Sequence, residues 1–235
     1  MKYKQLIFDV DDTLIDFAAT EDSSLHALFK SHKLPLSSDL QKQYHTYNQG
    51  LWRRLELGEI TYEELSEMTF HDFIKEHLGL EVDGIEWMNE YRSYFGEAHQ
   101  LLPGVEDTLK FAKKQGYKLT VLSNGEKFMQ RHRLELAGIK DYFDLIVTSE
   151  EAHYSKPNPH AFDYFFSRTE IGPNETLFFG DGLQSDILGA EKYGFDSIWY
   201  NHRHRKDNIG LHPLFEVETY PEFVKLMQND FKKAY

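Results

Sequence analysis

The amino-acid sequence predicts an α/β fold, a doubly wound parallel sheet with an inserted all-helical domain. Three observations lead to this prediction. A short apolar run near the start of the chain ends in a cluster of aspartates, a block rich in helix signals follows, and apolar runs then alternate with helical stretches. Alternation of strands and helices is typical of a parallel sheet whose faces are covered by helices.

The composition is that of a globular protein with ample material for a core. Of the 235 residues, 40% are hydrophobic and 28% are charged, which is ordinary for a folded domain. The formal net charge of -13 disfavours a long nucleic acid as a partner. The 0 cysteines exclude disulfides and thiol chemistry and fit a reducing compartment.

The location is expected to be cytoplasmic, with no membrane partner. No apolar stretch approaches the roughly 20 residues that a membrane helix needs. The first apolar run breaks at Asp9, too early for a signal peptide. We expect a monomer or a small homo-oligomer.

The first predicted strand ends in three carboxylates. Residues 6–8 are all apolar, and Asp9, Asp11 and Asp12 follow them. Strand alternation puts Asp9 and Asp11 on one side of the chain. Two carboxylates held close together repel each other unless a cation or a proton is present, and a site of hard oxygen ligands suits Mg²⁺. The simpler interpretation is a turn with solvated aspartates.

The next block is expected to hold at least four helices, two of them near 39–57 and 62–78. The start and stop signals are Thr20 as a cap, the capping-box pairs Ser38–Gln41 and Thr61–Glu64, Gly79 as a stop and Asp83 as a cap. These helices could simply belong to the core, but the block is too long for one crossover connection. We therefore predict a core domain of residues 1–15 and 100–235, and a helical cap domain of residues 16–99.

The remainder of the chain alternates between strands and helices. Strands are predicted at 117–122, 144–148, 176–179 and 197–200, with intervening helices that include ones near 160–168 and 185–193, and a final helix near 221–232. The loop SKPNP at 155–159 is expected to be rigid because proline fixes φ at two points.

Polar side chains follow several of these strands. They are Asp9, Asp11, Ser123, Lys156, Asp181 and Asp186. Because the carboxyl ends of parallel strands meet at one edge of a sheet, we expect these side chains to converge. They offer a nucleophile, an acid/base, a hydroxyl beside backbone N–H groups, a cation and metal-binding carboxylates, which is the set that phosphoryl transfer through an aspartyl-phosphate requires.

Each of these signals also has a simpler interpretation when taken alone. Residues 123–125 could be a plain turn, Lys156 a solvated loop lysine and Asp186 a helix cap. The stretch GDGLQS is unlike a dinucleotide-binding loop because its third glycine is missing and it does not lie in the first strand–helix unit. The shared edge favours the functional interpretation of the set as a whole.

The four stretches DVDDT, LSNG, SKPNP and GDGLQSDI resemble, in this order, the four motifs of the haloacid dehalogenase-like (HAD) hydrolases. The resemblance covers essentially the whole chain, and the helical insert is similar to the small helical cap of that superfamily. The stretches DYFDLIVTSEEA and GDGLQSDILGA, with LW at 51–52, resemble the bacterial pyrimidine 5′-nucleotidase branch.

The resemblance implies a Mg²⁺-dependent phosphomonoester hydrolase with a Rossmann-like core. Asp9 would attack phosphorus and become the aspartyl-phosphate. Asp11 would protonate the leaving oxygen and then take a proton from the hydrolytic water. Mg²⁺ would be bound by Asp9, the backbone carbonyl of Asp11 and Asp181, with Asp186 supporting the metal or its waters.

The resemblance also implies how substrate is bound. Ser123, the backbone N–H of Asn124 and Lys156 would bind the phosphoryl group. Trp52 of the cap is a candidate for binding the rest of the substrate, and Phe17 could touch it at the cap hinge. Other cap side chains that could stack on or hydrogen-bond a base are Tyr44, Tyr47 and Arg53. Aromatic residues at helical spacing more often belong to the core.

The tract HRHRK at His202 to Lys206 has no place in the four motifs. A His-x-His pair can bind metal, and a short basic run can contact phosphate. We favour a solvated loop here.

The expected function is a 5′-nucleotidase that acts on pyrimidine nucleoside monophosphates, so its partner is a small phosphorylated metabolite. A sugar-phosphate or phosphoglycolate phosphatase, or a phosphomutase, of the same fold is the main alternative. A 2-haloacid dehalogenase does not need an acid at the position of Asp11, so the presence of Asp11 argues against this function. A phosphate-accepting receiver module carries its aspartate on a middle strand, whereas the candidate nucleophile here, Asp9, follows the first strand. A non-catalytic phosphate-binding protein is disfavoured because every motif position is filled.

Overall fold

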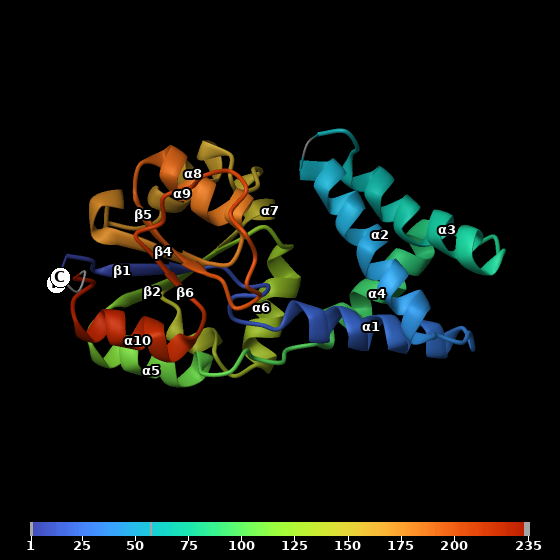
Figure 1. Ribbon diagram of the computed structural model, residues 1–235, viewed down its shortest axis with the longest axis horizontal. Coiled ribbons are helices and arrows are strands. Elements are labelled where there is room, and N and C mark those ends of the chain that lie inside the picture. Colours follow the sequence, from blue (N-terminus) through green and yellow to red (C-terminus); the bar gives the residue numbers. More distant parts are fainter. Residues whose placement is uncertain (1, 57, 233–235) are drawn as a thin grey trace. The chain divides into compact units, whose positions relative to one another are not determined.

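In the part of the chain that the structure describes, the sheet has six strands, and every neighbouring pair is parallel. The computed structural model describes residues 2–56 and 58–232 (Figure 1). The strand order is β3-β2-β1-β4-β5-β6, so the predicted doubly wound α/β fold is confirmed. The strands are β1 (Gln5–Phe8), β2 (Lys118–Ser123), β3 (Leu145–Thr148), β4 (Thr176–Gly180), β5 (Asp196–Tyr200) and β6 (Phe215–Val217).

Helices cover both faces of the sheet, which is why the central strands are apolar on both sides. Leu6 and Phe8 of β1 pack into one hydrophobic cluster, and Ile7 between them packs into another. Figure 1 shows α5 and α10 on one face, and α8 and α9 on the other. These four helices are α5 (Val105–Lys114), α8 (Pro159–Phe166), α9 (Leu188–Tyr193) and α10 (Tyr220–Gln228).

The register brings the carboxyl ends of the three central strands to one level. Phe8 of β1 pairs with Val121 of β2 and with Phe179 of β4. The polar residues that follow these three positions therefore lie at the same edge of the sheet. This edge is where ligands bind in open α/β sheets.

Short elements complete this part of the chain. They are α6 (Lys127–Leu136), the 3₁₀ turns η1 (Lys140–Tyr142) and η2 (Pro173–Glu175), α7 (Ser149–Ala152) and the π-helical turn η3 (Leu183–Ile187). The helix predicted near 185–193 thus begins as a π-helical turn. The sequence analysis missed β6, whose three residues pair with residues 198–200 of β5; a strand this short has no alternation pattern of its own.

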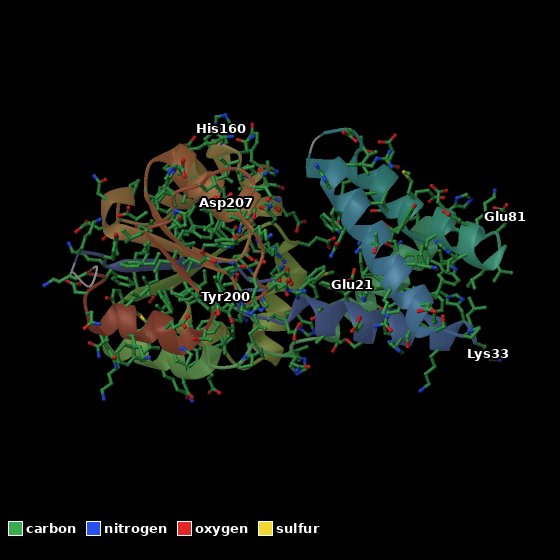
Figure 2. All side chains as sticks on the ribbon, in the orientation of Figure 1. Glu21, Lys33, Glu81, His160, Tyr200 and Asp207 are labelled. Atoms are coloured by element: carbon green, nitrogen blue, oxygen red, sulfur yellow. The ribbon has the colours of Figure 1, made fainter. Side chains whose placement is uncertain are left out.

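The residues between β1 and α5 form four helices. They are α1 (Phe17–Ser31), α2 (Ser38–Glu56), α3 (Tyr62–Leu78) and α4 (Gly84–Glu97). Their shared core is rich in aromatic rings, such as Tyr44 and Phe70, whose stacked centroids lie 5.7 Å apart. The buried carboxylate of Glu21 on α1 (labelled in Figure 2) accepts a hydrogen bond of 2.6 Å from Asn48 Nδ2 on α2 and lies against His45. Burial raises the pKa of Glu21.

Three of the predicted helix signals are confirmed. Thr61 and Glu64 form the reciprocal capping box at the start of α3. Gly79 ends α3 in the left-handed conformation with φ 67°, which glycine adopts without steric cost. The side chain of Asp83 accepts a hydrogen bond from Glu86 N at the start of α4.

Two other signals were wrong. Thr20 is not a cap, because α1 begins at Phe17, whose N–H donates to the Asp12 carboxylate at 3.1 Å. The Ser38–Gln41 box does not form: Ser38 is already helical, and the preceding Ser37 hydroxyl accepts from Leu40 N at 3.1 Å. The predicted end of this helix at residue 57 lies outside the described residues.

The chain divides into two compact units. One comprises Met1–Phe17 with His99–Tyr235, and the other, called here the helical unit, comprises Ala18–Ala98. Among the described residues, no helix combines the length and apolar character that crossing a membrane requires.

The other unit, Met1–Phe17 with His99–Tyr235, is called here the α/β unit. The two connections to the helical unit run side by side within it. Ile15 and Leu101 form an antiparallel β-bridge. Asp16 N donates to Gln100 O at 2.8 Å. The ends of the inserted segment are therefore held together by backbone hydrogen bonds of the α/β unit itself.

Candidate active site

Three carboxylates and one lysine meet at the carboxyl edge of the sheet. Asp9 follows β1, Asp181 follows β4 and Asp186 lies in η3; one carboxylate oxygen of each lies within 4.8 Å of the other two. The Lys156 Nζ is 2.7 Å from Asp9 Oδ1 and 2.7 Å from Asp186 Oδ1. All four residues are buried, so the structure brings together four of the predicted site residues.

The electrostatics of this cluster favour an added positive charge. Burial raises the pKa of Asp9 to about 7, although the charge of Lys156 lowers it. Burial also raises the pKa of Asp181 well above its usual value, and the charges of Asp186 and Asp9 add to this effect. Burial alone lowers the pKa of Lys156, but the charges of Asp186 and Asp9 offset this and raise it overall.

These residues fit a hard divalent cation. Carboxylate oxygens are the ligands that Mg²⁺ prefers, and one lysine does not neutralise three carboxylates. The raised pKa values of Asp9 and Asp181 show the same imbalance, because a buried carboxylate without enough positive charge binds a proton instead. The groups that could hold the cation are Asp9, Asp181 and Asp186.

The glycines of GDG make room for Asp186. A Cβ on Gly180 would lie 2.3 Å from Asp186 Oδ2, and one on Gly182 would lie 2.1 Å from Ser185 Oγ. The Gly182 N–H donates to Asp186 Oδ2 at 2.9 Å. The carboxylate can therefore turn back against the end of β4 only because both positions lack a side chain.

The loop that carries Lys156 is held by Asn124. The Asn124 Oδ1 accepts from Lys156 N at 2.7 Å, and its Nδ2 donates to Lys156 O at 3.0 Å. The side-chain amide of Asn124 thus positions Lys156. Because that amide is already engaged, the group of Asn124 that can bind a ligand is its backbone N–H.

Thr13 and Trp199 hold Asp181 in place, and the sequence analysis gave neither a role. The Thr13 hydroxyl accepts from Asp181 N at 3.1 Å. The Trp199 Nε1 donates to Asp181 O at 3.0 Å. The position of Thr13 within DVDDT was the available signal.

The side chain of Asp11 points to different partners. Its Oδ1 accepts from Arg133 Nη1 at 2.6 Å, and its Oδ2 accepts from Gln130 Nε2 at 2.7 Å. Gln130 Nε2 also lies 3.2 Å from Ser123 Oγ. The predicted residues Asp11 and Ser123 are therefore neighbours that are joined through Gln130 of α6. The sequence analysis missed both Gln130 and Arg133.

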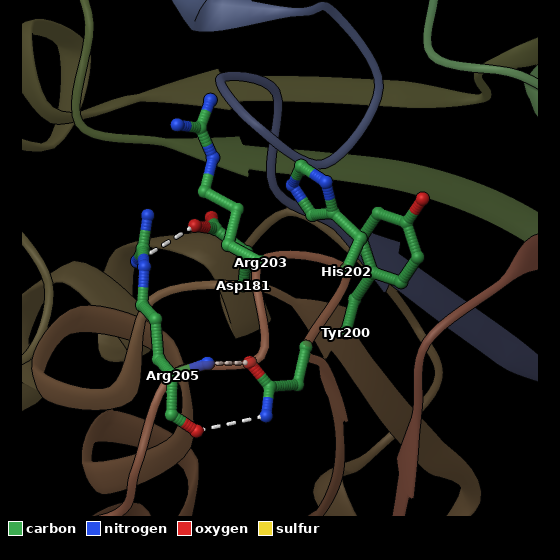
Figure 3. Close-up of a pocket in the computed structure, with 6 residues that line it drawn as sticks. Asp181, Tyr200, His202, Arg203 and Arg205 are labelled. Atoms are coloured by element: carbon green, nitrogen blue, oxygen red, sulfur yellow. Dashed lines mark hydrogen bonds and ion pairs between the residues drawn. The ribbon is translucent and has the colours of Figure 1, made fainter.

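The basic tract after β5 reaches the same edge (Figure 3). Arg203 Nη2 lies 2.6 Å from Asp12 Oδ1, and Arg205 Nη1 lies 3.1 Å from Asp181 Oδ2. Asn201 holds the tract by accepting from Arg205 N and donating to Arg205 O. Residues 203–206 are exposed, as the interpretation of a solvated loop held, but the two arginines also pair with the strand-end carboxylates.

The two histidines of the tract make separate contacts. The ring of His202 stacks on Tyr200 with centroids 4.8 Å apart, and burial lowers its pKa. His204 is exposed, and its Nδ1 lies 3.2 Å from Glu218 Oε1. The pair therefore does not present two nitrogens to one metal ion.

The candidate substrate-binding residues of the helical unit differ in exposure. Trp52 is 39% exposed, and its ring lies edge-to-face with that of Tyr62 at 6.3 Å. The Arg92 guanidinium lies 5.1 Å from the Tyr62 centroid, a cation–π distance. Tyr44 is fully buried and belongs to the core, as the simpler interpretation held. Tyr47 donates its hydroxyl to Met68 O.

The family of the protein follows from sequence comparison. The model of the haloacid dehalogenase-like hydrolase family matches residues 3–194. The chain belongs to this family of hydrolases, as the four motifs indicated.

Three relatives match nearly the whole chain. YfnB of Bacillus subtilis, named a HAD-hydrolase, is 35% identical over 96% of each chain. The pyrimidine 5′-nucleotidase PynA of Streptococcus pneumoniae is 32% identical and covers 98% of this chain and 97% of its own. The pyrimidine 5′-nucleotidase YjjG of Escherichia coli is 30% identical, with coverage of 97% and 99%.

Comparison with solved structures gives the same grouping. The crystal structure of YfnB bound to magnesium aligns with a TM-score of 0.92 at 35% identity and covers 97% of this chain and 99% of that one. Among the sequence relatives, at lower identity, the glyceraldehyde 3-phosphate phosphatase of Pyrococcus furiosus is 26% identical over 86% of this chain and 82% of its own.

Proposed function

We propose that the protein is a Mg²⁺-dependent phosphomonoesterase that acts on nucleoside 5′-monophosphates, with pyrimidine nucleotides preferred. The observation that carries the proposal is the division of one strand end into two environments. Asp9 lies in a buried cluster with Lys156 that fits a cation, whereas Asp11, two residues later, lies between Gln130 and Arg133. This division supports Asp9 as the nucleophile and Asp11 as the group that transfers protons.

In the first half of the proposed reaction, Asp9 is phosphorylated. A carboxylate oxygen of Asp9 forms a bond to phosphorus, and the bond from phosphorus to the ester oxygen breaks. The ester oxygen takes a proton from the Asp11 carboxyl group and leaves as the nucleoside alcohol. In the second half, water attacks phosphorus and gives a proton to Asp11. The bond from phosphorus to Asp9 then breaks, and inorganic phosphate leaves.

The transferred group is to be held by donors at the same edge. The Ser123 hydroxyl, the Asn124 N–H and the Lys156 ammonium are assigned to the phosphoryl oxygens. Bound Mg²⁺ would supply the further positive charge that the phosphoryl oxygens and Asp9 together require. Because the Asn124 side chain hydrogen-bonds both the N–H and the carbonyl oxygen of Lys156, the lysine charge is preorganised for this task.

The substrate class is supported by the relatives rather than by the edge of the sheet. Two proteins named pyrimidine 5′-nucleotidases match essentially the full chain at 30% identity or more. In the helical unit, Trp52 and Tyr62 offer exposed aromatic rings, and such rings bind bases by stacking. We assign substrate selection to the helical unit.

The test is phosphate release from a panel of phosphomonoesters, measured with Mg²⁺ and with EDTA. The panel holds UMP, dUMP, dTMP, purine monophosphates, glyceraldehyde 3-phosphate, other sugar phosphates and phosphoglycolate. Mg²⁺-dependent release that is highest for pyrimidine monophosphates is the expected result. A maximum on a sugar phosphate would keep the mechanism and overturn the substrate class, whereas no release from any compound would overturn both.

A further inference from the structure

Two side chains of helix α6 bind the two carboxylate oxygens of Asp11. Gln130 Nε2 lies 2.7 Å from Asp11 Oδ2, and Arg133 Nη1 lies 2.6 Å from Asp11 Oδ1. A carboxylate bound at both oxygens by donors from a rigid helix has little freedom to rotate. The Asp11 side chain is still 28% exposed, so one side of the carboxylate remains open to a ligand.

The Gln130 amide also connects Asp11 to Ser123. Its Nε2 lies 3.2 Å from Ser123 Oγ, and its Oε1 accepts from Arg133 Nη1 at 3.3 Å. An amide nitrogen carries two hydrogens, so it can donate to the carboxylate and to the hydroxyl at once. The contact with Arg133 determines which end of the amide is the oxygen.

The same network orients the Ser123 hydroxyl. The Oγ accepts from Gly125 N at 3.2 Å and from Gln130 Nε2 at 3.2 Å. A hydroxyl has two acceptor positions and one hydrogen. With both acceptor positions filled, Ser123 keeps its hydrogen for donation to a bound oxygen.

Gly125 makes room for Gln130. A Cβ at this position would lie 2.2 Å from Gln130 Nε2 and 2.7 Å from its Cγ. The φ of Gly125 is outside the left-handed region, so the backbone does not demand glycine here. The glycine of the LSNG motif is therefore explained by the space that the Gln130 side chain needs.

Arg133 is buried despite its charge. Its side chain is 0% exposed and lies next to Leu134 on a buried face of α6. Burying a guanidinium is expensive in free energy, and a well-packed apolar residue is often as stable in such a place. Arg131 of the same helix, by contrast, is 35% exposed and binds Ile146 O and Glu151.

We propose that Gln130 and Arg133 are positioning residues that hold the Asp11 carboxyl group toward the leaving oxygen of the substrate, and that Gly125 is required because Gln130 occupies its side-chain space. The inference rests on the proposed function. It goes beyond the proposed function because it assigns a role to two residues of α6, a helix that carries none of the motif carboxylates.

The experiment compares two substrates that need the acid to different degrees. UMP has an alkyl leaving oxygen that must be protonated, whereas p-nitrophenyl phosphate releases a weakly basic phenolate that needs little help from an acid. If the panel selects another alkyl phosphomonoester, that ester replaces UMP. The variants are Gln130→Ala, Arg133→Met, Arg133→Lys and Gly125→Ala, with Arg131→Met as the matched control. The readout is kcat/KM, which reports the phosphorylation step.

We expect Gln130→Ala and Arg133→Met to lower kcat/KM for UMP by about 10- to 100-fold, and that for p-nitrophenyl phosphate by less than about 3-fold. Arg133→Lys is expected to fall between wild type and Arg133→Met, because lysine restores the charge without the planar fork. Arg131→Met is expected to behave as wild type on both substrates. Equal losses on both substrates would indicate general damage and overturn the inference, as would unchanged kcat/KM.

A double-mutant cycle tests the role of Gly125 separately. Gly125→Ala alone is expected to reproduce the loss seen in Gln130→Ala. In the Gln130→Ala background the same change should cost nothing further, because the side chain that it displaces is absent. Additive losses would overturn the assignment of Gly125.

Folding is checked for every variant by circular dichroism and thermal unfolding. Should Arg133→Met not fold, Gln130→Ala and the double-mutant cycle decide the question. An inactive wild type would remove the proposed function and this inference with it. An active wild type with unaffected Gln130→Ala would remove this inference alone.

Discussion

The two carboxylates that follow β1, Asp9 and Asp11, lie in different electrostatic surroundings. On the side of β4, Asp9 shares a buried cluster with Asp181, Asp186 and one lysine, and burial raises its pKa to about 7. On the side of α6, Asp11 is partly exposed and is bound by one neutral and one cationic donor. The cluster around Asp9 has too little positive charge for its three carboxylates, whereas Asp11 already has an arginine partner.

Two identical side chains two residues apart therefore have different electrostatic surroundings. A carboxylate in a cluster short of positive charge stabilises an incoming cation, and with it a substrate phosphate. A carboxylate that already has an arginine partner has less need of a cation, which separates Asp11 from the cation site and fits the different role that we propose for it.

The largest effect is expected on the Asp9 side. Asp9→Asn should lower kcat by about 10⁴-fold or more, because the amide is a poor nucleophile. The fold should survive, since the change removes a buried charge that the raised pKa shows to be unfavourable. Phosphate release and thermal unfolding at pH 8 measure both effects; substantial turnover by this variant would refute the aspartyl-phosphate.

The matching change on the other side is Asp11→Asn. It should lower kcat/KM for an alkyl phosphomonoester by about 10²- to 10³-fold, the usual contribution of a general acid. With p-nitrophenyl phosphate the first step needs the acid less, but water still lacks a base in the second. A burst of p-nitrophenolate equal to the enzyme concentration is therefore expected in stopped-flow traces. Its absence would mean that Asp11 does not act in the second step.

The charge deficit on the Asp9 side predicts a pH dependence of Mg²⁺ binding. The pKa of Asp9 rises from 3.8 to about 7 on folding, so below pH 7 the cation must displace a proton. We expect the Kd for Mg²⁺ to rise by about 10-fold or more per pH unit below 7, because Asp181, whose pKa is also raised, must lose its proton as well. Isothermal titration calorimetry at pH 5.5, 6.5 and 8 measures this. A Kd independent of pH would contradict the deficit.

The same shift fixes the sign of the stability effect without the cation. Between pH values of about 4 and 7 the folded state binds more protons at Asp9 than the unfolded state does, so the free energy of unfolding should fall as pH rises through this window. Asp9→Asn serves as the control, because the variant has no proton to lose there and its profile should be flatter.

The smallest effect is expected from the basic tract. Arg205 pairs with Asp181 on the cation side, so Arg205→Gln should tighten Mg²⁺ binding by about 2- to 5-fold, the range of an exposed ion pair. Arg203→Gln is the matched control, because Arg203 contacts Asp12 instead. Equal Kd values for the two variants would show that Arg205 does not compete with the cation.

The sequence was a good guide where a signal is local. The apolar run before Asp9 predicts a strand, and the capping box at Thr61 needs only residues three apart, so both could be identified directly. The convergence of Asp9, Lys156 and Asp181 also followed, because parallel strands place their carboxyl ends together whatever the loops between them do.

The site residues that the sequence analysis did not identify come from segments that are distant in sequence. Gln130 lies 119 positions from Asp11, and Arg203 lies 191 positions from Asp12. Their contacts depend on the rotation of a helix and the path of a loop, which no local pattern specifies. The rejected cap at Thr20 has a similar cause: the carboxylate of Asp12, five residues before Phe17, satisfies the first turn of α1 earlier than the local pattern indicates.

The β-bridge between Ile15 and Leu101 has a consequence for the history of the chain. Because the two ends of the inserted segment are already joined, its length can vary at little entropic cost, since loop closure depends only weakly on loop length. A gene that gains, loses or exchanges this segment keeps its strand order and the side chains at the edge of its sheet. If the helical unit selects the substrate, as we propose, exchange of this segment changes the substrate while the residues at the edge of the sheet stay the same.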